Sequence, residues 1–142
     1  MSFWEGLDNV YIKDLSSWCK IDFENSASNP LDYYSGKLYL NNELLTELVI
    51  PEDITEIKNY TFKGANLRKV TMHDNVTSIG DLSFGGCDLD EFTFGRNVTS
   101  IGSNIYDSCK KINIPNLEWL FNIEYADHGL YDNGGIIYID NQ

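Results

Sequence analysis

The sequence predicts a short, mostly β repeat solenoid with right-handed coils and with capping units that contain short helices. Two observations predict this fold class. A pattern of apolar residues recurs with a period of 22 residues across residues 44–110, and a longer segment before these repeats recurs after them. A repeat of this length indicates a solenoid, because one repeat cannot bury its own apolar face and must stack on the next.

Residues 1–43 are predicted to form a capping unit made of a strand, a short helix, a loop and a second strand. Asp14 stands where a helix N-cap would, just before a stretch with helical apolar spacing. Two runs of alternating apolar residues meet at Asn41 and Asn42, and asparagine tolerates the positive φ angles of a tight hairpin turn. A β-hairpin is therefore expected to lead from this unit into the regular repeats.

Residues 44–110 contain three copies of the repeat, which keep seven positions in register without a gap. The alternation at the start of each copy predicts a short strand with one buried face, and the remainder returns the chain and adds a second apolar line. Stacking places equivalent residues about 4.8 Å apart, so the core is expected to consist of ladders. The seven positions are Leu45, Leu67 and Leu89; Leu48, Val70 and Phe92; Ile50, Met72 and Phe94; Ile54, Val76 and Val98; Ile57, Ile79 and Ile101; Phe62, Phe84 and Tyr106; and Ala65, Cys87 and Cys109.

Residues 111–142 are predicted to form a second capping unit because they repeat the first. Residues 10–23 match residues 112–125 at a constant offset of 102, and after a three-residue deletion the match continues at an offset of 99. Asn116 takes the N-cap place of Asp14. Atypical terminal units suit the ends of a solenoid, where an open core must be covered. The three segments are expected to form one continuous solenoid domain.

The repeat motif resembles that of the BspA-like leucine-rich repeats. The resemblance is carried by LVIPEDITEIKNYTFKGANL, VTSIGDLSFGGCDL and VTSIGSNIYDSC. The segment SNPL…LYLNNELLTELVIPE also resembles a unit often found between blocks of such repeats. The resemblance covers residues 10–142 and implies a leucine-rich-repeat solenoid. Members of this family are commonly secreted or surface-attached proteins that bind other proteins or host surfaces.

The composition predicts a folded and strongly acidic protein. The 22 Asp and Glu residues outnumber the 10 Lys and Arg residues, which gives a formal net charge of −12. Such a surface repels nucleic acid and anionic membranes, so neither is expected as a direct partner and a basic protein fits better. Residues 1–43, 44–110 and 111–142 each carry a net charge of −4, and an even excess of this kind is typical of a surface that keeps a protein soluble.

The three cysteines do not predict a disulfide framework, because their number is odd. Cys87 and Cys109 lie at the same position of adjacent repeats, where stacking would permit either a disulfide or two buried thiols. We favour the thiols, since Ala65 shows that a small apolar residue suffices there. No signal peptide and no stretch that could span a bilayer are found, so a cytoplasmic protein is expected.

No set of residues in the sequence predicts an enzyme. The motifs of serine hydrolases, nucleotide-binding loops and zinc proteases are absent. His73 stands at the repeat position of Pro51 and Gly95, which predicts an exposed turn residue, and the only other histidine is His128. Two cysteine sulfurs alone do not make a metal site. No cofactor is expected either.

The function expected from these observations is non-catalytic protein–protein interaction, because solenoids bind along surfaces where equivalent side chains form rows. The first candidate surface is the set of strand positions that point away from the core, whose alternative is a plain solvated sheet face. These positions are Glu47, Val49, Lys69, Thr71, Glu91, Thr93 and Asn113.

The second candidate surface is the last predicted strand, for which the sequence offers no hairpin partner like that of the first unit. An unpaired apolar edge recruits a strand from a partner or from a second copy of the chain, which would give a homodimer. The alternative is that Asp140 and the residues after it blunt the edge. The strand residues are Ile136, Ile137, Tyr138 and Ile139.

The alternative function uses the acidic surface itself. About seven strand layers would make a rod of roughly 30 Å. The net charge of −12 then amounts to about one charge per 2.5 Å, close to the one per ~1.7 Å of duplex DNA. An acidic inhibitor that mimics nucleic acid, such as an anti-defence protein of a mobile element, is therefore the second hypothesis. A relative of bacterial surface adhesins is the third.

Overall fold

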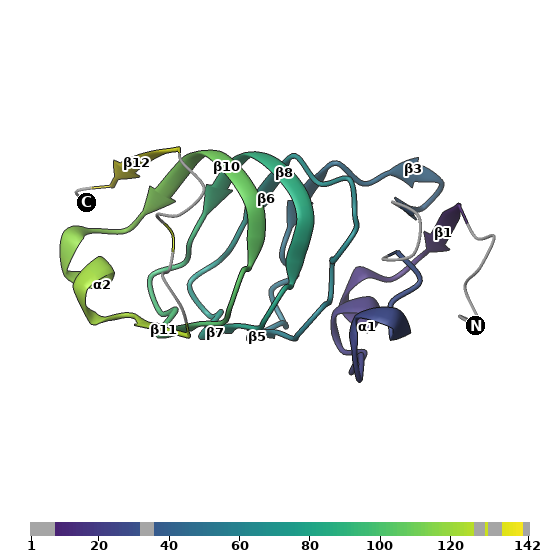
Figure 1. The fold of residues 1–142 in the computed structure, drawn as a ribbon, viewed down its shortest axis with the longest axis horizontal. Helices are drawn as coiled ribbons and strands as arrows, with labels where there is room; N and C mark the ends of the chain where they lie inside the picture. The colour runs from purple at the N-terminus through teal and green to yellow at the C-terminus, as the bar shows by residue number, and fades with distance from the viewer. Residues whose placement is uncertain (1–7, 32–35, 127–129, 131–134, 141–142) are drawn as a thin grey trace.

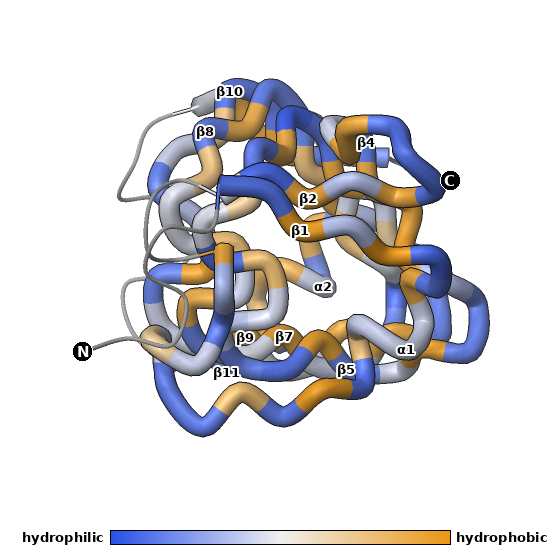
Figure 2. Tube along the Cα trace, turned by 90° about the vertical axis from the view of Figure 1, so that its right-hand side faces the viewer, coloured by the Kyte–Doolittle hydropathy of each residue, from blue (hydrophilic) through white to orange (hydrophobic). Residues whose placement is uncertain are grey.

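A computed structural model describes residues 8–31, 36–126, 130 and 135–140 of the chain. The chain forms a solenoid of stacked coils that is mostly β (Figure 1). Successive coils pair in parallel on two opposite sides, one formed by a five-stranded sheet and the other by a four-stranded sheet. Viewed along the solenoid axis, the coils superpose as a ring with one sheet on each side (Figure 2). The predicted fold class is confirmed.

The first unit has the predicted order of strand, helix, loop and strand. Asp14 caps its helix by accepting a hydrogen bond from the amide of Ser16 at 3.0 Å. Asn41 and Asn42 form the predicted hairpin turn with φ angles of 51° and 67°. The elements are β1 (Asn9–Ile12), α1 (Leu15–Cys19), the 3-10 turn η1 (Ser26–Ser28), β2 (Lys37–Leu40) and the hairpin strand β3 (Glu43–Leu44), and β1, β2 and β3 form a separate three-stranded sheet.

The five-stranded sheet takes one strand from each successive coil. Its register follows the 22-residue period, since Leu48 pairs with Val70 and Val70 with Phe92, and all three side chains are buried. Two of its strands run longer than predicted because they also pair at the repeat aromatics, Phe84 with Tyr106. The strands are β4 (Glu47–Val49), β6 (Lys69–Thr71), β8 (Phe84–Thr93), β10 (Tyr106–Ile114) and β12 (Ile136–Ile139).

The four-stranded sheet lies on the opposite side and supplies the second apolar line of each repeat. Its strands are only two residues long, and the isoleucine of each central strand is buried. The strands are β5 (Glu56–Ile57), β7 (Ser78–Ile79), β9 (Ser100–Ile101) and β11 (Glu124–Tyr125).

The core between the two sheets consists of the predicted ladders. Phe62 and Phe84 stack with ring centroids 5.6 Å apart and planes 7° from parallel. Tyr106 continues the aromatic position in the next coil, where its ring lies 5.6 Å from that of Phe92. All four rings are buried, so the aromatic position of each repeat fixes the spacing of the coils.

The second unit closes the far end of this core. Asn116 caps α2 (Leu117–Asn122) by accepting a hydrogen bond from the amide of Trp119 at 2.8 Å. The Trp119 ring is buried and lies 5.1 Å from that of Phe94. Neither α1 nor α2 is long enough to cross a membrane, and the described residues contain no other α-helix.

The expectation that His73 is an exposed turn residue is wrong. Its side chain is only 12% exposed. Its Nε2 lies 2.9 Å from the carbonyl oxygen of Pro51 in the preceding coil, and its Nδ1 accepts a hydrogen bond from the amide of Asn75 at 3.1 Å. The contact with Pro51 joins the coil of His73 to the coil before it. His128 lies outside the described residues.

Candidate functional site

The outward side chains of the five-stranded sheet form one surface, which we call the sheet face. The seven residues singled out in the sequence all lie on it, because the strand register aligns them in two rows. One row contains Glu47, Lys69 and Glu91 and continues to Lys111 and Ile136. The other row contains Val49, Thr71, Thr93, Asn113 and Tyr138.

The charged row of the sheet face is neutralised by its own neighbours. The carboxylate of Glu91 lies between Lys69 at 3.6 Å and Lys111 at 3.7 Å. It also accepts a hydrogen bond from Nδ2 of Asn113 at 2.8 Å. This hydrogen bond, followed by the two lysine charges, lowers the pKa of Glu91. Such solvent-facing pairs contribute little stability, but they hold the row in a fixed arrangement.

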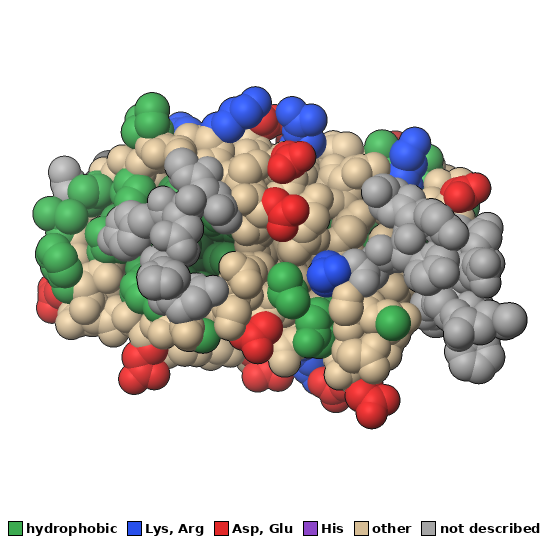
Figure 3. Space-filling model, in the orientation of Figure 1, with side chains coloured by type: hydrophobic (Ala, Val, Ile, Leu, Met, Phe, Trp, Pro, Cys, Tyr) green, Lys and Arg blue, Asp and Glu red, His purple; other side chains and the backbone are tan. Residues whose placement is uncertain are grey.

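A second charged ladder lies beside the sheet face. Asp90 binds Arg68 at 3.0 Å and Lys110 at 3.1 Å. The sheet face and this ladder hold four basic residues, Arg68, Lys69, Lys110 and Lys111, against three acidic ones, Glu47, Asp90 and Glu91. In Figure 3 basic side chains gather along the upper edge, over this sheet, and acidic ones along the lower edge. The excess negative charge of the protein therefore lies elsewhere.

Strand β12 extends the sheet face with apolar side chains. Ile136 and Tyr138 are 62% and 48% exposed, and the ammonium of Lys111 lies 4.8 Å from the centroid of the Tyr138 ring. Among the described strands, β12 pairs only with β10 and so lies at the end of the sheet. Val49, 68% exposed, lies on the strand at the other end of the sheet.

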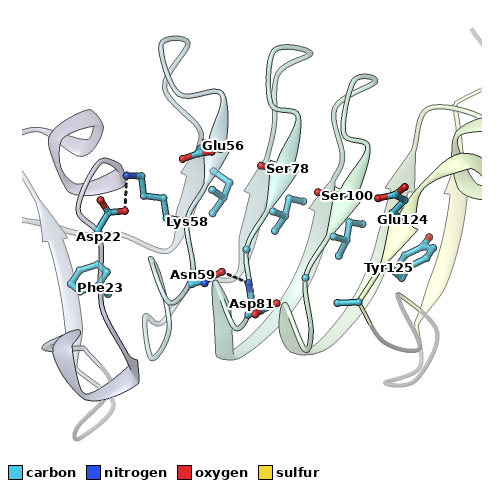
Figure 4. A pocket seen from close by; sticks show the side chains of 16 residues that line it. Asp22, Phe23, Glu56, Lys58, Asn59, Ser78, Asp81, Ser100, Glu124 and Tyr125 are labelled. Carbon is cyan, nitrogen blue, oxygen red and sulfur yellow. Dashed lines mark hydrogen bonds and ion pairs between the residues drawn. The ribbon is translucent and has the colours of Figure 1, made fainter.

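A groove runs along the outer side of the four-stranded sheet, and the sequence reasoning did not find it. It has a volume of about 560 Å³ and extends from Phe23 in the first unit to Tyr125 in the second. Equivalent residues of successive coils, Glu56, Ser78 and Ser100, follow one another along it (Figure 4). The signal in the sequence was weak because two-residue strands leave no alternating pattern.

Side chains that reach from one coil to the next build the groove floor. Asn59 Oδ1 accepts a hydrogen bond from the amide of Asp81 at 2.8 Å, and Asp81 Oδ1 accepts one from the amide of Ser103 at 2.8 Å. These side chains occupy the space beside Gly80 and Gly102, where a Cβ would lie 2.5 Å from the Asn59 nitrogen and 2.6 Å from the Asp81 nitrogen. The glycine of the V-T-x-I-G motif is thus a packing requirement.

Three carboxylates of the groove are either paired with a lysine or far from each other. Asp22 forms an ion pair with Lys58 at 2.7 Å. Glu56 and Glu124 belong to coils three layers apart, about 14 Å at the usual strand spacing, which is too far for the paired carboxylates of a glycosidase. Within the described ranges, no three His, Cys, Asp or Glu side chains form a group that could hold a metal ion.

The three thiols are buried and free. Cys87 Sγ donates to the carbonyl oxygen of Ala65 at 3.0 Å. Burial raises the pKa of Cys19 and of Cys87 to about 12 and that of Cys109 to about 11. Because the thiolate is the reactive form, these side chains act as small apolar groups in the core.

Comparison with known proteins identifies the repeat. Residues 33–139 match the model of a family described as BspA type leucine rich repeat region, in six copies. The six copies exceed the three regular repeats, so the match extends into both capping units. No curated protein and no solved structure matches the chain.

Proposed function

The chain belongs to the BspA type leucine rich repeat family, and from that premise we propose that it is a non-catalytic interaction module that binds another protein through its sheet face. The single observation that carries this proposal is the character of that face. It combines paired charges with exposed apolar side chains, including Val49 and Tyr138. Protein interfaces are enriched in aromatic residues, depleted in charged residues at their centre and bordered by a polar rim.

The rest of the surface supports a basic partner. A net charge of −12 that lies mainly away from the sheet face would steer a basic protein toward the solenoid without having to enter the contact. The free thiols Cys19, Cys87 and Cys109 support a reducing compartment such as the cytoplasm. No cofactor and no direct nucleic acid or membrane contact forms part of this proposal.

The acidic mimic remains the alternative proposal, and its surface would be the groove side. Four acidic residues and one basic residue line the groove, namely Asp22, Glu56, Asp81, Glu124 and Lys58. Over about 19 Å of stacked coils this is roughly one net charge per 6 Å, several times sparser than the one per ~1.7 Å of duplex DNA. The low charge density of the groove therefore makes the mimic proposal weaker than the sheet-face proposal. A third proposal, a relative of surface adhesins, rests on the family alone.

A capture experiment with matched variants tests the proposal. The full chain is immobilised and exposed to lysate of its source cell at low and high salt, and retained proteins are identified by mass spectrometry. The test variant carries Thr71→Arg and Thr93→Arg on the sheet face. The control carries Ser78→Arg and Ser100→Arg, at the same spacing on the other sheet, and circular dichroism verifies that both fold.

The proposal predicts that the wild type and the control variant retain one partner at both salt concentrations. The test variant should bind this partner more than tenfold more weakly, a loss of at least ~1.4 kcal/mol of binding free energy. Loss of partner binding by the control variant alone would contradict the sheet-face proposal. Capture of only basic nucleic-acid-handling proteins, released by high salt, would favour the mimic, since exposed charge pairs are screened within about 10 Å at ~0.1 M salt.

A further inference from the structure

The two capping units repeat each other in sequence, yet equivalent side chains differ in burial. Cys19 at the end of α1 is 2% exposed, whereas its counterpart Phe121 at the end of α2 is 81% exposed. Trp18 is buried, but its counterpart Leu120 is half-buried. One side of the second unit is therefore exposed, whereas the equivalent side of the first unit is covered.

The first regular repeat packs against this side of the first unit and covers it. Trp18 Nε1 donates to the carbonyl oxygen of Thr61 at 3.0 Å, and Asn29 Nδ2 donates to that of Tyr60 at 2.6 Å. At the rim, Lys20 pairs with Asp53 at 2.9 Å. No coil among the described residues stands in this position beyond the second unit.

Apolar side chains gather on this uncovered end, as the left-hand side of Figure 3 shows. Of the nine exposed large apolar residues in the described part of the chain, five belong to α2 or β12. We call them the C-terminal end patch, which consists of Leu117, Phe121, Ile136, Tyr138 and Ile139. An exposed apolar patch of this kind marks an interaction site.

The first unit also shows which strand direction fits the free edge of β12. Tyr138 and Ile139 of β12 correspond to Tyr39 and Leu40 of β2. The outer edge of β2 pairs with β3, and this pairing is antiparallel. The free edge of β12 is thus equivalent to an edge that takes an antiparallel strand.

We propose that a second copy of this chain occupies the C-terminal end patch, with the two β12 strands pairing antiparallel about a two-fold axis. A two-fold axis perpendicular to the strand makes β12 antiparallel to its own copy, so a second β12 supplies the direction that this edge requires. The same axis sets the two end patches against each other, and such an isologous contact closes as a dimer. The dimer contact shares Ile136 and Tyr138 with the sheet face, but its formation needs no other protein.

The charge of the protein gives the dimer a distinctive salt dependence. Two chains of net charge −12 repel each other, while the contact itself is apolar. Raising the salt from about 0.1 M to about 1 M shortens the screening length from about 10 Å to about 3 Å. Dimerisation is therefore expected to strengthen with salt, in contrast to binding driven by opposite charges.

Sedimentation equilibrium of the full chain, from micromolar to near-millimolar concentration and at both salts, tests the proposal. The expected result is a concentration-dependent rise from a mass of 16.2 kDa to twice that mass, with tighter association at high salt. Phe121→Lys with Ile139→Lys should weaken association at least tenfold. Tyr11→Lys changes an exposed aromatic residue of β1 in the first unit and should leave the dimer intact.

Three results would overturn the proposal. The first is a monomer at every concentration and salt. The second is association that the end-patch variant does not weaken. The third is species that grow beyond a dimer and disappear with Tyr11→Lys, which would show head-to-tail stacking of β12 on β1. All three are read from mass without any partner, so they are independent of the sheet-face proposal.

Discussion

The glycine that ends each V-T-x-I-G stretch shows how a single residue depends on the neighbouring coil. The backbone of Gly102 passes against the side chain and amide of Asp81, which leaves no room for a Cβ. Lys58 occupies the same repeat position in the first copy and is tolerated there. The requirement therefore comes from the coil before it and not from the turn.

This contact predicts that Gly102→Ala lowers the free energy of unfolding by about 1–3 kcal/mol, the usual cost of overpacking. Lys58→Ala is the matched control and should change it by no more than about 0.5 kcal/mol. Urea denaturation of the two variants and the wild type measures both values. Equal stability of Gly102→Ala and the wild type would show that the coils can move apart at no cost.

The buried thiols predict a loss of stability in alkali. Burial raises the pKa of Cys87 from 9.0 to about 12. The folded state keeps this proton while the unfolded chain releases it, so stability is full below pH ~9 and falls as the pH rises toward ~12. Cys87→Ala restores the residue found at Ala65 and should flatten this fall. Thermal unfolding midpoints from pH 8 to pH 11 provide the comparison, and parallel curves for the two proteins would refute the assignment.

At the scale of elements, the hairpin between β2 and β3 makes a sharp prediction. Asn42 has a φ of 67°, a region that costs a β-branched residue about 1–2 kcal/mol. Asn42→Val should lower the free energy of unfolding by about that amount, whereas Asn42→Gly should not. Chemical denaturation distinguishes the two variants. If the Asn42→Val protein were as stable as the Asn42→Gly protein, residue 42 would not have the left-handed backbone geometry described.

The sequence predicted those elements whose signal is local. The alternation around Leu48 predicted β4, and the side chains of Asp14 and Asn116 predicted the starts of α1 and α2. The period of 22 residues then predicted the register between strands, because parallel stacking aligns equivalent residues. These signals were sufficient for the fold and for the seven residues of the sheet face.

The features that the sequence missed depend on contacts between coils. His73 is half-buried because its Nε2 lies against the carbonyl oxygen of Pro51, 22 residues earlier in the chain. The groove was missed because strands such as β7 (Ser78–Ile79) are too short to show a period. The segregation of charge was missed because each of the three segments carries the same net charge of −4, while the fold sets the side of the coil on which each charged residue lies.

On the scale of the whole molecule, two sides of one solenoid carry different properties. One side presents the sheet face, where the ammonium groups of Lys69 and Lys111 flank the carboxylate of Glu91. The other presents a groove in which acidic residues outnumber basic ones. A rigid repeat holds the two sides apart, so contact and electrostatic steering can act on a partner from separate surfaces.

Site-specific photocrosslinking shows whether a partner protein contacts the sheet face. A photoreactive phenylalanine derivative is placed at Thr71 or Thr93 and, as the matched control, at Ser78 or Ser100 on the opposite sheet. We expect a crosslinked partner from the two threonine positions and none from the two serine positions. Crosslinks from Ser78 and Ser100 alone would contradict it and would place the binding site in the groove.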